Sequence, residues 1–365
     1  MKEKIKILFL SPYPEDKAPS QRLKYEQYFE CFRNEGFEIE TKSFVTNKFW
    51  DIIYKKGLFI KKSYYTIAAY IKRFYQLFFL HKYDIVYVHL WVTPIGLPIF
   101  EFFTRLFSKK LIYDIDDMIF LGHSSAANRF MQNIKGKGKM IYLMKKADHV
   151  ITCTPKLTEF VNQFNTRTTD ISSTVDTNSR YNPQNNYEND HKIIIGWSGS
   201  HSTSKYLYLL EKVLKRLAKN FEFTLMVMGD ENFRINGVEV IAIQWLEAIE
   251  METLKKFDIG LYPLPDEEWV YGKSGLKAIQ YMALGIPTIA TAIGANYRII
   301  EDEKNGFLIP VGNDNLWYDR LSELIVNAKL RKSVGEAGRK TIEKLYSIDA
   351  NKDLYIKAFH SCVNY

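Results

Sequence analysis

Short apolar runs separated by amphipathic stretches recur along the first half of the chain. Runs at residues 4–10, 84–89, 110–113 and 149–152 have the length and composition of buried strands. Helical periodicity lies between them, and its first stretch covers residues 21–34 and ends near Gly36. Strands that alternate with helices in this way indicate parallel βαβ units. The first half therefore predicts a doubly wound α/β domain.

The same alternation of predicted strands and helices resumes after residues 179–192. This segment is rich in Asn and poor in apolar residues, and we interpret it as an interdomain linker. Further strands are predicted at residues 192–196, 223–228, 238–243, 257–262 and 287–291, and helices at 204–220, from 246 and at 276–284. We therefore expect an α/β protein of two Rossmann-like domains, covering residues 1–186 and 187–346.

Composition agrees with two domains and indicates the cellular compartment. At 365 residues with 46% hydrophobic and 25% charged residues, the chain is long enough for two globular domains. Cys31, Cys153 and Cys362 have no short pairing spacing, which favours a reducing compartment over a disulfide framework or a zinc site. The apolar run at the N-terminus is too short for a signal peptide, and no charge-free stretch of about 18 apolar residues occurs. A cytoplasmic protein is expected.

The net charge of +8 belongs to the first half. Residues 1–190 hold 28 Lys and Arg against 20 Asp and Glu, whereas residues 191–365 hold 22 of each. Within residues 48–82, eight basic residues interleave with aromatic residues, and Asp51 is the sole acid. Such a stretch is suited to an anionic lipid surface. The alternative is a pair of amphipathic helices with a solvated basic face. Nucleic acid is not expected, because no nucleic-acid-binding module is recognisable.

Gly272-Lys273-Ser274 has the appearance of the end of a nucleotide-triphosphate loop. A Walker loop also needs a glycine five positions earlier, where this chain has Glu267. The motif precedes a predicted helix, whose free N–H groups favour an anion, and Lys273 adds a positive charge. Gly275 permits close approach of a ligand, and Gln280 lies about one turn into the helix, where its amide could bind ribose hydroxyls. The alternative is an ordinary turn with an exposed lysine.

A second candidate is the Gly- and Ser-rich segment GWSGSHSTSK, residues 196–205, which follows the first strand of the second half. Doubly wound sheets bind ligands at the carboxyl ends of their strands. Gly199, Ser200 and Lys205 are therefore candidate anion-binding residues. The alternative is a helix cap by Ser202 or Thr203 with a solvated Lys205.

The first half offers acidic and basic candidates. In YDIDD, residues 113–117, Asp114 and Asp116 point to the same side if the strand continues, and such a pair could hold Mg²⁺ or Mn²⁺ against a diphosphate. The alternative is capping of the next segment. Ser20 and Arg22 end the loop after the first strand and are candidates for contact with an acceptor or a phosphate, the alternative being a solvated arginine.

Residues 273–315, KSGLKAIQYMALGIPTIATAIGANYRIIEDEKNGFLIPVGNDN, resemble the donor-site signature of retaining glycosyltransferases with the GT-B fold. This is glycosyltransferase family four, also called glycosyl transferases group one, which includes many bacterial cell-surface polysaccharide enzymes. Gln280–Pro287 and Asn305–Pro310 carry the match, with Gly294 between them. Val175-Asp176-Thr177 resembles the end of the first domain of such proteins. Residues 347–365 resemble their last helix, which crosses back to the N-terminal domain.

The resemblance implies two Rossmann-like domains facing a central cleft, an acceptor-binding N-terminal domain and a C-terminal domain that binds a nucleotide sugar. Carried over position by position, it implies catalytic roles for Asp116, Lys205 and Lys273. The donor residues are then Gly199, Ser200, Lys205, Lys273, Ser274, Gly275, Leu276 and Gln280. Ser20 and Arg22 would contact the acceptor. GT-B enzymes generally need no metal, so metal at Asp114 and Asp116 is the minority interpretation and no cofactor is expected.

The activity implied is transfer of a hexosyl unit, with retention, from a UDP- or GDP-sugar to a hydroxyl of a glycan or lipid-linked acceptor. Such an enzyme would be cytoplasmic and peripheral on the inner face of the plasma membrane, with contact through residues 48–82. The sequence departs from the family where arginine is replaced by Ser200, where histidine is replaced by Asp116 and where two glutamates are replaced by Gly272 and Gln280. Asp266, Glu267 or Glu268 could replace the first glutamate.

Two alternatives remain open. The lost glutamate also fits a non-catalytic subunit that binds a nucleotide sugar and derives from a transferase. An epimerase of the same fold would convert the donor without an acceptor, but it would need acidic or histidine groups that the sequence does not place.

Overall fold

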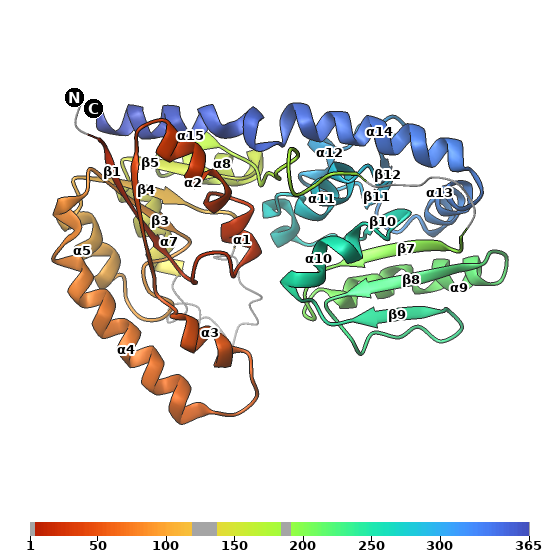
Figure 1. Cartoon of the computed structure of the whole chain (residues 1–365), viewed down its shortest axis with the longest axis horizontal. Coiled ribbons are helices and arrows are strands. Elements are labelled where there is room, and N and C mark those ends of the chain that lie inside the picture. Colours follow the sequence, from red (N-terminus) through yellow and green to blue (C-terminus); the bar gives the residue numbers. More distant parts are fainter. Residues whose placement is uncertain (1–3, 119–136, 184–190, 365) are drawn as a thin grey trace. The chain divides into compact units, whose positions relative to one another are not determined.

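A computed structural model of the chain describes residues 4–118, 137–183 and 191–364 (Figure 1). The chain divides into two compact units. Unit 1 comprises Met1–Ser173 with Asn351–Tyr365, and unit 2 comprises Thr174–Ala350.

Unit 1 is built on a six-stranded parallel sheet in the order β2-β1-β3-β4-β5-β6. Its central strands are apolar and buried on both faces, as a parallel sheet covered by helices requires. The strands are β1 (Lys6–Ser11), β2 (Glu38–Ser43), β3 (Ile85–His89), β4 (Lys110–Asp114), β5 (His149–Thr152) and β6 (Thr168–Asp170).

Helices cover the faces of this sheet. They are α1 (Pro19–Arg22), α2 (Phe29–Asn34), α3 (Asn47–Ile53), α4 (Phe59–Leu77), α5 (Ile99–Phe107), α7 (Lys137–Lys146), α8 (Pro155–Asn162) and α15 (Ile348–Val363), with 3₁₀ turns η1 (Glu26–Tyr28) and η2 (Leu80–Lys82). Tyr355 and Phe359 of α15 pack within an aromatic cluster with Phe32, at ring-centroid distances of 5.7 Å and 5.0 Å. These contacts place the C-terminal helix in the core of unit 1.

Unit 2 repeats the architecture with a six-stranded parallel sheet in the order β12-β11-β10-β7-β8-β9 (Figure 1). Trp197, Leu225 and Leu261 are among the residues of its continuous apolar core. The strands are β7 (Ile193–Ser198), β8 (Phe223–Met228), β9 (Val240–Ile243), β10 (Ile259–Tyr262), β11 (Thr288–Thr291) and β12 (Phe307–Ile309).

The helices of unit 2 are α9 (Glu211–Ala218), α10 (Glu247–Leu254), α11 (Leu276–Ala283), α12 (Asn296–Ile299), α13 (Asp314–Val326) and α14 (Ala328–Leu345), with 3₁₀ segments η5 (Ser204–Leu210) and η6 (Glu268–Gly272). Helix α11 packs against β10, β11 and α14. The strands that flank it therefore fix where its first turn lies.

The predicted doubly wound α/β class is confirmed, and the strands predicted from apolar runs are present to within a few residues. The helix predicted at 21–34 is wrong in detail, because α1, η1 and α2 break it into short pieces. The helix predicted at 204–220 begins as the 3₁₀ segment η5 before α9. Of the predicted linker, residues 184–190 lie outside the described residues.

Candidate functional site

The order of the strands in unit 2 marks one position for a ligand. From β7 the chain moves to β8 and β9 on one side, whereas β10, β11 and β12 lie on the other side. The order therefore reverses between β7 and β10. Ligands of open α/β sheets bind outside the carboxyl ends of the strands at such a switch point. The two segments singled out in the sequence, 199–205 and 272–280, follow β7 and β10 respectively.

A buried tyrosine connects these two segments. Tyr281 of α11 accepts a hydrogen bond at 2.8 Å from the backbone N–H of Ser198, the last residue of β7, and its hydroxyl lies 3.0 Å from Oγ of Ser198. Burial raises the pKa of Tyr281, so the hydroxyl stays neutral. Helix α11 is thereby fixed against the end of β7.

Glycines let the loops at the ends of β7 and β8 approach each other. Gly229 has φ +116°, and a Cβ atom there would lie 1.7 Å from the carbonyl oxygen of Gly199. A Cβ atom at Gly199 would lie 2.4 Å from the Trp197 ring and 3.0 Å from Cε of Lys277. Both positions therefore need glycine for steric reasons.

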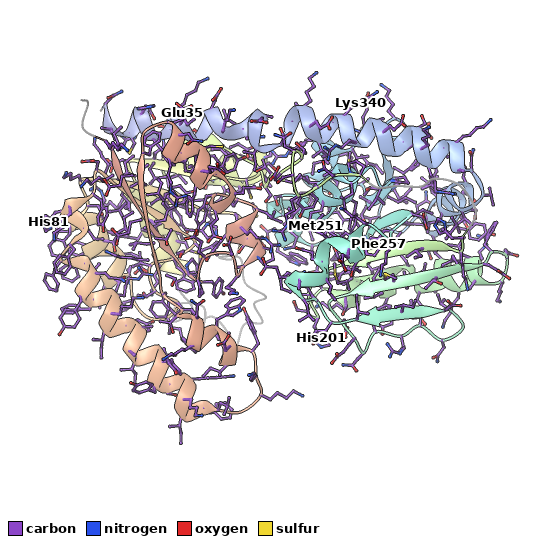
Figure 2. The ribbon with its side chains drawn as sticks, in the orientation of Figure 1. Glu35, His81, His201, Met251, Phe257 and Lys340 are labelled. Atoms are coloured by element: carbon purple, nitrogen blue, oxygen red, sulfur yellow. The ribbon has the colours of Figure 1, made fainter. Side chains whose placement is uncertain are left out.

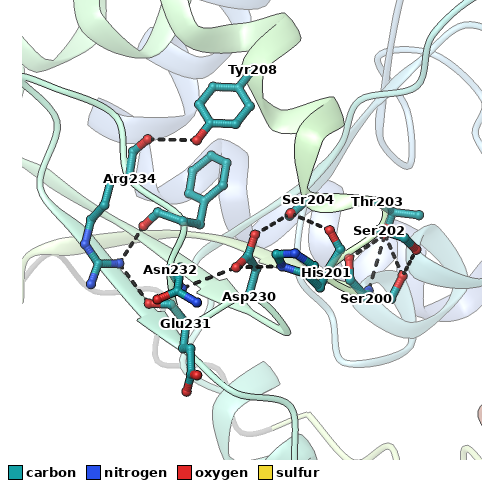
Figure 3. Close-up of polar contacts among 11 residues, drawn as sticks. Ser200, His201, Ser202, Thr203, Ser204, Tyr208, Asp230, Glu231, Asn232 and Arg234 are labelled. Atoms are coloured by element: carbon teal, nitrogen blue, oxygen red, sulfur yellow. Dashed lines mark hydrogen bonds and ion pairs between the residues drawn. The ribbon is translucent and has the colours of Figure 1, made fainter. Parts of the chain in front are cut away.

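The loop after Gly199 is held by a network of polar contacts (Figure 3). Asp230 accepts a hydrogen bond from Oγ of Ser204 at 2.5 Å, and its other oxygen lies 3.0 Å from Nδ1 of His201. Burial acts to raise the pKa of Asp230, but hydrogen bonds from Ser204 and His201 outweigh burial and lower it. Ser200 lies within this loop, where its Oγ is 2.9 Å from Oγ of Ser202.

Sequence reasoning did not select Asp230. The available signal was its position directly after Gly229, the glycine that follows β8, the strand paired with β7 in the sheet. Because Oγ of Ser204 bonds to the carboxylate of Asp230 and to the backbone carbonyl of His201, and not to the imidazole ring, the three side chains lack the geometry of a Ser-His-Asp nucleophile. We therefore assign Asp230 to loop positioning.

The structure brings Lys205 and Lys273 into one neighbourhood through two aromatic rings. Nζ of Lys205 lies 5.2 Å from the ring centroid of Tyr206, and Nζ of Lys273 lies 4.9 Å from that of Trp269. The two rings lie 5.6 Å apart. Lysines separated by 68 positions in the sequence thus each contact one ring of a single aromatic pair.

The first turn of α11 shortly follows Lys273 in the chain. Its N-cap is Gly275, with φ +76°, and a Cβ atom there would lie 2.3 Å from Cδ1 of Ile299. The N-cap residue makes no side-chain hydrogen bond and the first turn has no acidic residue. Ser274 and Gly275 are buried, and Leu276 is half-buried. The backbone N–H groups of this turn suit an anion.

Gln280 lies in the same helix but its side chain is already engaged. It is buried, and its Nε2 donates to the hydroxyl of Tyr181 at 2.8 Å. Arg339 in turn donates to the carbonyl oxygens of Tyr181 and Thr177, which holds that segment against unit 2. The predicted contact of Gln280 with a ribose stays a prediction.

Acidic residues that could replace the missing glutamate lie just before η6 and at its first residue. Asp266, Glu267 and Glu268 are exposed. Glu267 accepts a hydrogen bond from the indole Nε1 of Trp269, and its charge acts on Tyr206. Glu267 is therefore the one of the three that contacts the aromatic pair between Lys205 and Lys273.

In unit 1, the two aspartates after β4 differ in environment. Asp114 is fully buried, with Nζ of Lys24 at 3.3 Å and Nδ1 of His89 at 3.0 Å. Burial acts to raise its pKa, but Lys24 and His89 lower it. Asp116 is half-buried, and burial raises its pKa. Across the described ranges, no three His, Cys, Asp or Glu side chains are grouped to hold a metal ion.

The acceptor candidates lie in α1 of the same unit. Ser20 is half-buried, whereas Arg22 is 4% exposed, so the alternative of a solvated arginine is wrong. Their contact with an acceptor stays a prediction.

The basic-aromatic stretch 48–82 forms α3 and α4, and the outward face of α4 is apolar. Exposed apolar side chains recur there at helical spacing: Ile60, Tyr64, Ile67, Ile71, Phe74 and Phe78. Ile60 is 88% and Ile67 61% exposed. Helix α5 adds Ile99, Phe102 and Leu106. Figure 2 shows the side chains of these helices. Among the described helices, none is long and apolar enough to cross a membrane.

Comparisons with known proteins show that part of unit 2 is similar to a known family of domains. Residues 192–327, which contain both loops of the site, match the family described as glycosyl transferases group 1. An uncharacterized glycosyltransferase, MJ1178 of Methanocaldococcus jannaschii, is 28% identical over 137 residues. That match covers 34% of this chain and 37% of the relative, so the chain spans little more than a third of its length.

Solved structures resemble the whole chain. A sucrose-phosphate synthase from Thermosynechococcus elongatus superposes with a TM-score of 0.69 at 15% identity, covering 98% of this chain and 100% of that one. Anabaena HepE in complex with UDP-glucose superposes with a TM-score of 0.65 at 14% identity and the same coverage. With the two parallel sheets, these likenesses show a two-domain α/β GT-B fold, and the fold prediction is confirmed.

Proposed function

We propose that the protein is a glycosyltransferase that moves a hexosyl unit, with retention, from a nucleotide-diphosphate donor to a hydroxyl acceptor. The observation that carries this proposal is that Lys205 and Lys273 each contact one ring of the Tyr206–Trp269 pair, and that Lys273 shortly precedes the first turn of α11 at the switch point of unit 2. The matched family supports sugar transfer. The HepE structures with UDP and with UDP-glucose support a UDP-sugar over the GDP-sugar that is also open.

In the proposed reaction, the bond between the anomeric carbon and the diphosphate oxygen breaks while a bond to the acceptor oxygen forms. The electron pair of the broken bond stays on the diphosphate. The proton of the acceptor hydroxyl passes to an oxygen of the donor phosphate, so no protein base is needed. The main task of the site is to stabilise charge that develops on the leaving diphosphate.

In this proposal, several residues of unit 2 stabilise the charge on the diphosphate. Lys273 and Lys205 supply positive charge, and the amides of Ser274, Gly275 and Leu276 supply hydrogen-bond donors. Gly199 and Ser200 line the approach from the end of β7. In this proposal, the Gln280 amide gives up its hydrogen bond to Tyr181 and binds the ribose instead. Without the donor, Tyr181 holds the amide in one orientation.

Unit 1 (residues 1–173 with 351–365) is proposed to bind the acceptor, through Ser20 and Arg22, and Asp116 is proposed as a catalytic residue. The half-buried carboxylate of Asp116 suits this role better than Asp114, because Lys24 and His89 already pair with Asp114. The acceptor we propose is a glycan or lipid-linked intermediate of bacterial cell-surface polysaccharide synthesis.

The test is release of nucleoside diphosphate from UDP-, GDP- and ADP-sugars, with and without a lipid-linked acceptor extract. Acceptor-dependent release from one donor is expected. Binding of a donor without release would favour a non-catalytic subunit, which the glycine at position 272 in place of the family's first glutamate would then explain. Release of no diphosphate and binding of no donor would contradict the proposal.

We also propose that residues 48–82 make peripheral contact with an anionic membrane, on the cytoplasmic face of the plasma membrane. Lys55, Lys56 and Lys61 are exposed beside the apolar stripe of α4, so charge and apolar surface occur together. Helix α5 extends the same surface, since the Phe78 and Phe107 rings stack at 6.2 Å.

Sedimentation with vesicles tests this contact. Binding is expected to vesicles that contain phosphatidylglycerol and not to pure phosphatidylcholine. Replacing Ile60, Ile67 and Ile71 by Ser should weaken binding about tenfold or more. Replacing the exposed Val326 and Leu345 of unit 2 by Ser is the matched control. Equal binding of both variants would contradict the assignment.

A further inference from the structure

Lys277 was not selected from the sequence, although it forms the second lysine of Gly-Lys-x-x-x-Lys at residues 272–277. Its Nζ lies 5.1 Å from the ring centroid of Trp197 and 5.3 Å from that of Tyr262. Trp197 belongs to β7 and Tyr262 ends β10, the two strands between which the order of the sheet reverses. The amine therefore lies at the switch point itself.

The loop after β7 packs against the side chain of Lys277. Cε of Lys277 would lie 3.0 Å from a Cβ atom at Gly199, so the absence of a side chain at that position makes room for the lysine. Within the described part of the chain, the amine of Lys277 makes no hydrogen bond and no ion pair with another residue, and it lies against the faces of the two aromatic rings. A half-buried amine in this position lacks the anion that such a group normally has.

The pKa of the Lys277 amine also indicates that this position suits an anion. Burial and then the charge of Lys273 lower the pKa of Lys277 to about 7. The groups packed against it from β7, β10 and the loop are Trp197, Tyr262 and Gly199, of which only Tyr262 can titrate. An incoming polyanion would pair with both lysines and remove their mutual repulsion.

We propose that Lys277 is a third cationic residue of the donor site, which binds the diphosphate from the side of β7 and takes up a proton from solvent as the diphosphate binds. This inference rests on the proposed function. Lys277 would supply from α11 the positive charge that the resembling family supplies from an arginine where this chain has Ser200.

Calorimetric titration of the full chain with UDP and with GDP tests the role, with uridine and guanosine as ligands that lack the diphosphate. Lys277→Met keeps the aliphatic stem between the two rings and removes the charge. It should weaken binding of the diphosphate about tenfold to a hundredfold, because one charge-assisted contact is lost. Nucleoside binding should not change. Lys277→Arg should restore most of the affinity.

Titration in two buffers of different ionisation enthalpy measures the proton. The wild type should take up close to one proton at pH 8 and much less at pH 6, where the amine is already charged. Lys277→Arg and Lys277→Met should take up none at either pH.

The outcomes separate this inference from the proposed function. Equal UDP or GDP affinity in wild type and Lys277→Met, or proton uptake that persists in Lys277→Met, would overturn the role of Lys277 and leave the transferase proposal standing. If neither nucleoside diphosphate binds the wild type, the proposed function fails and this inference fails with it. If the circular dichroism spectrum shows that Lys277→Met is misfolded, Lys277→Arg decides the test. That variant must bind the nucleoside diphosphate without taking up a proton, and proton uptake by it would overturn the role of Lys277.

Discussion

The hydroxyl of Tyr281 accepts a hydrogen bond from the backbone N–H of Ser198 at 2.8 Å. This bond joins α11 to the end of β7, and so it joins the two segments that carry Gly199 and Lys273. Because Tyr281 is fully buried, the bond is shielded from water. The geometry of the candidate donor site depends on it.

Tyr281→Phe is therefore expected to destabilise unit 2. The substitution leaves the N–H of Ser198 buried without its partner, which costs about 1–3 kcal/mol in the free energy of unfolding. Urea denaturation followed by circular dichroism measures the difference. Tyr297→Phe, at an exposed tyrosine of the same unit, should change stability by less than about 0.5 kcal/mol. Equal stability of the two variants would show that the bond does not hold α11.

Gly229→Ala should be more damaging, because the new Cβ would lie 1.7 Å from the carbonyl oxygen of Gly199 and φ is +116°. We expect a loss of about 3 kcal/mol or more in the free energy of unfolding. Gly237→Ala is the matched control, since Gly237 has φ +81° but no atom within 4 Å of the added Cβ. It should cost about 1 kcal/mol. Similar losses in both variants would contradict the close approach of the two loops.

Lys273→Ala is expected to lower turnover about a hundredfold, because it removes positive charge beside the leaving diphosphate. The melting temperature should change little. Lys219→Ala, at an exposed lysine of unit 2, should retain full turnover. Release of nucleoside diphosphate from the donor found in the panel measures both variants. Near-normal turnover of Lys273→Ala would remove this lysine from the catalytic site.

Glu26 should make the stability of unit 1 depend on pH. Burial raises its pKa from 4.5 to about 7, although hydrogen bonds from the amide of Asp16 and the side chain of Gln21 favour the charged form. The folded state thus prefers the protonated carboxyl. Its contribution is fully present below about pH 4.5 and is lost as pH rises through about 7, by about 3 kcal/mol.

Glu26→Gln imitates the protonated carboxyl and should remove this dependence. Denaturation between pH 5 and pH 8 measures the slope. Glu30→Gln, at an exposed glutamate in α2, should keep the wild-type slope. A slope that is the same in the wild type and Glu26→Gln would show that another group is responsible.

Much of the architecture could be predicted from the sequence, because buried parallel strands are short apolar runs with little ambiguity. β7 and β8 are examples. The edge strands β2 and β6 were missed, because β2 (EIETKS) is half-exposed and polar and β6 has only three residues. Their pairing partners, and not their composition, make them strands.

The candidate site was predictable where a local motif existed and not where distant residues meet. Lys273 and Gly275 stand in a recognisable segment. The contact of Gln280 with Tyr181 spans 99 positions, and the loop contact of Asp230 with Ser204 spans 26. The position of Lys277 between Trp197 and Tyr262 depends on the order of the strands, which no local pattern contains.

The most direct measurement is a crystal structure of the protein soaked with UDP or GDP. We predict density for the diphosphate within hydrogen-bonding distance of Nζ of Lys273 and the first backbone amides of α11, beside Gly199. A diphosphate bound elsewhere on the chain, with this position filled by solvent alone, would contradict the account.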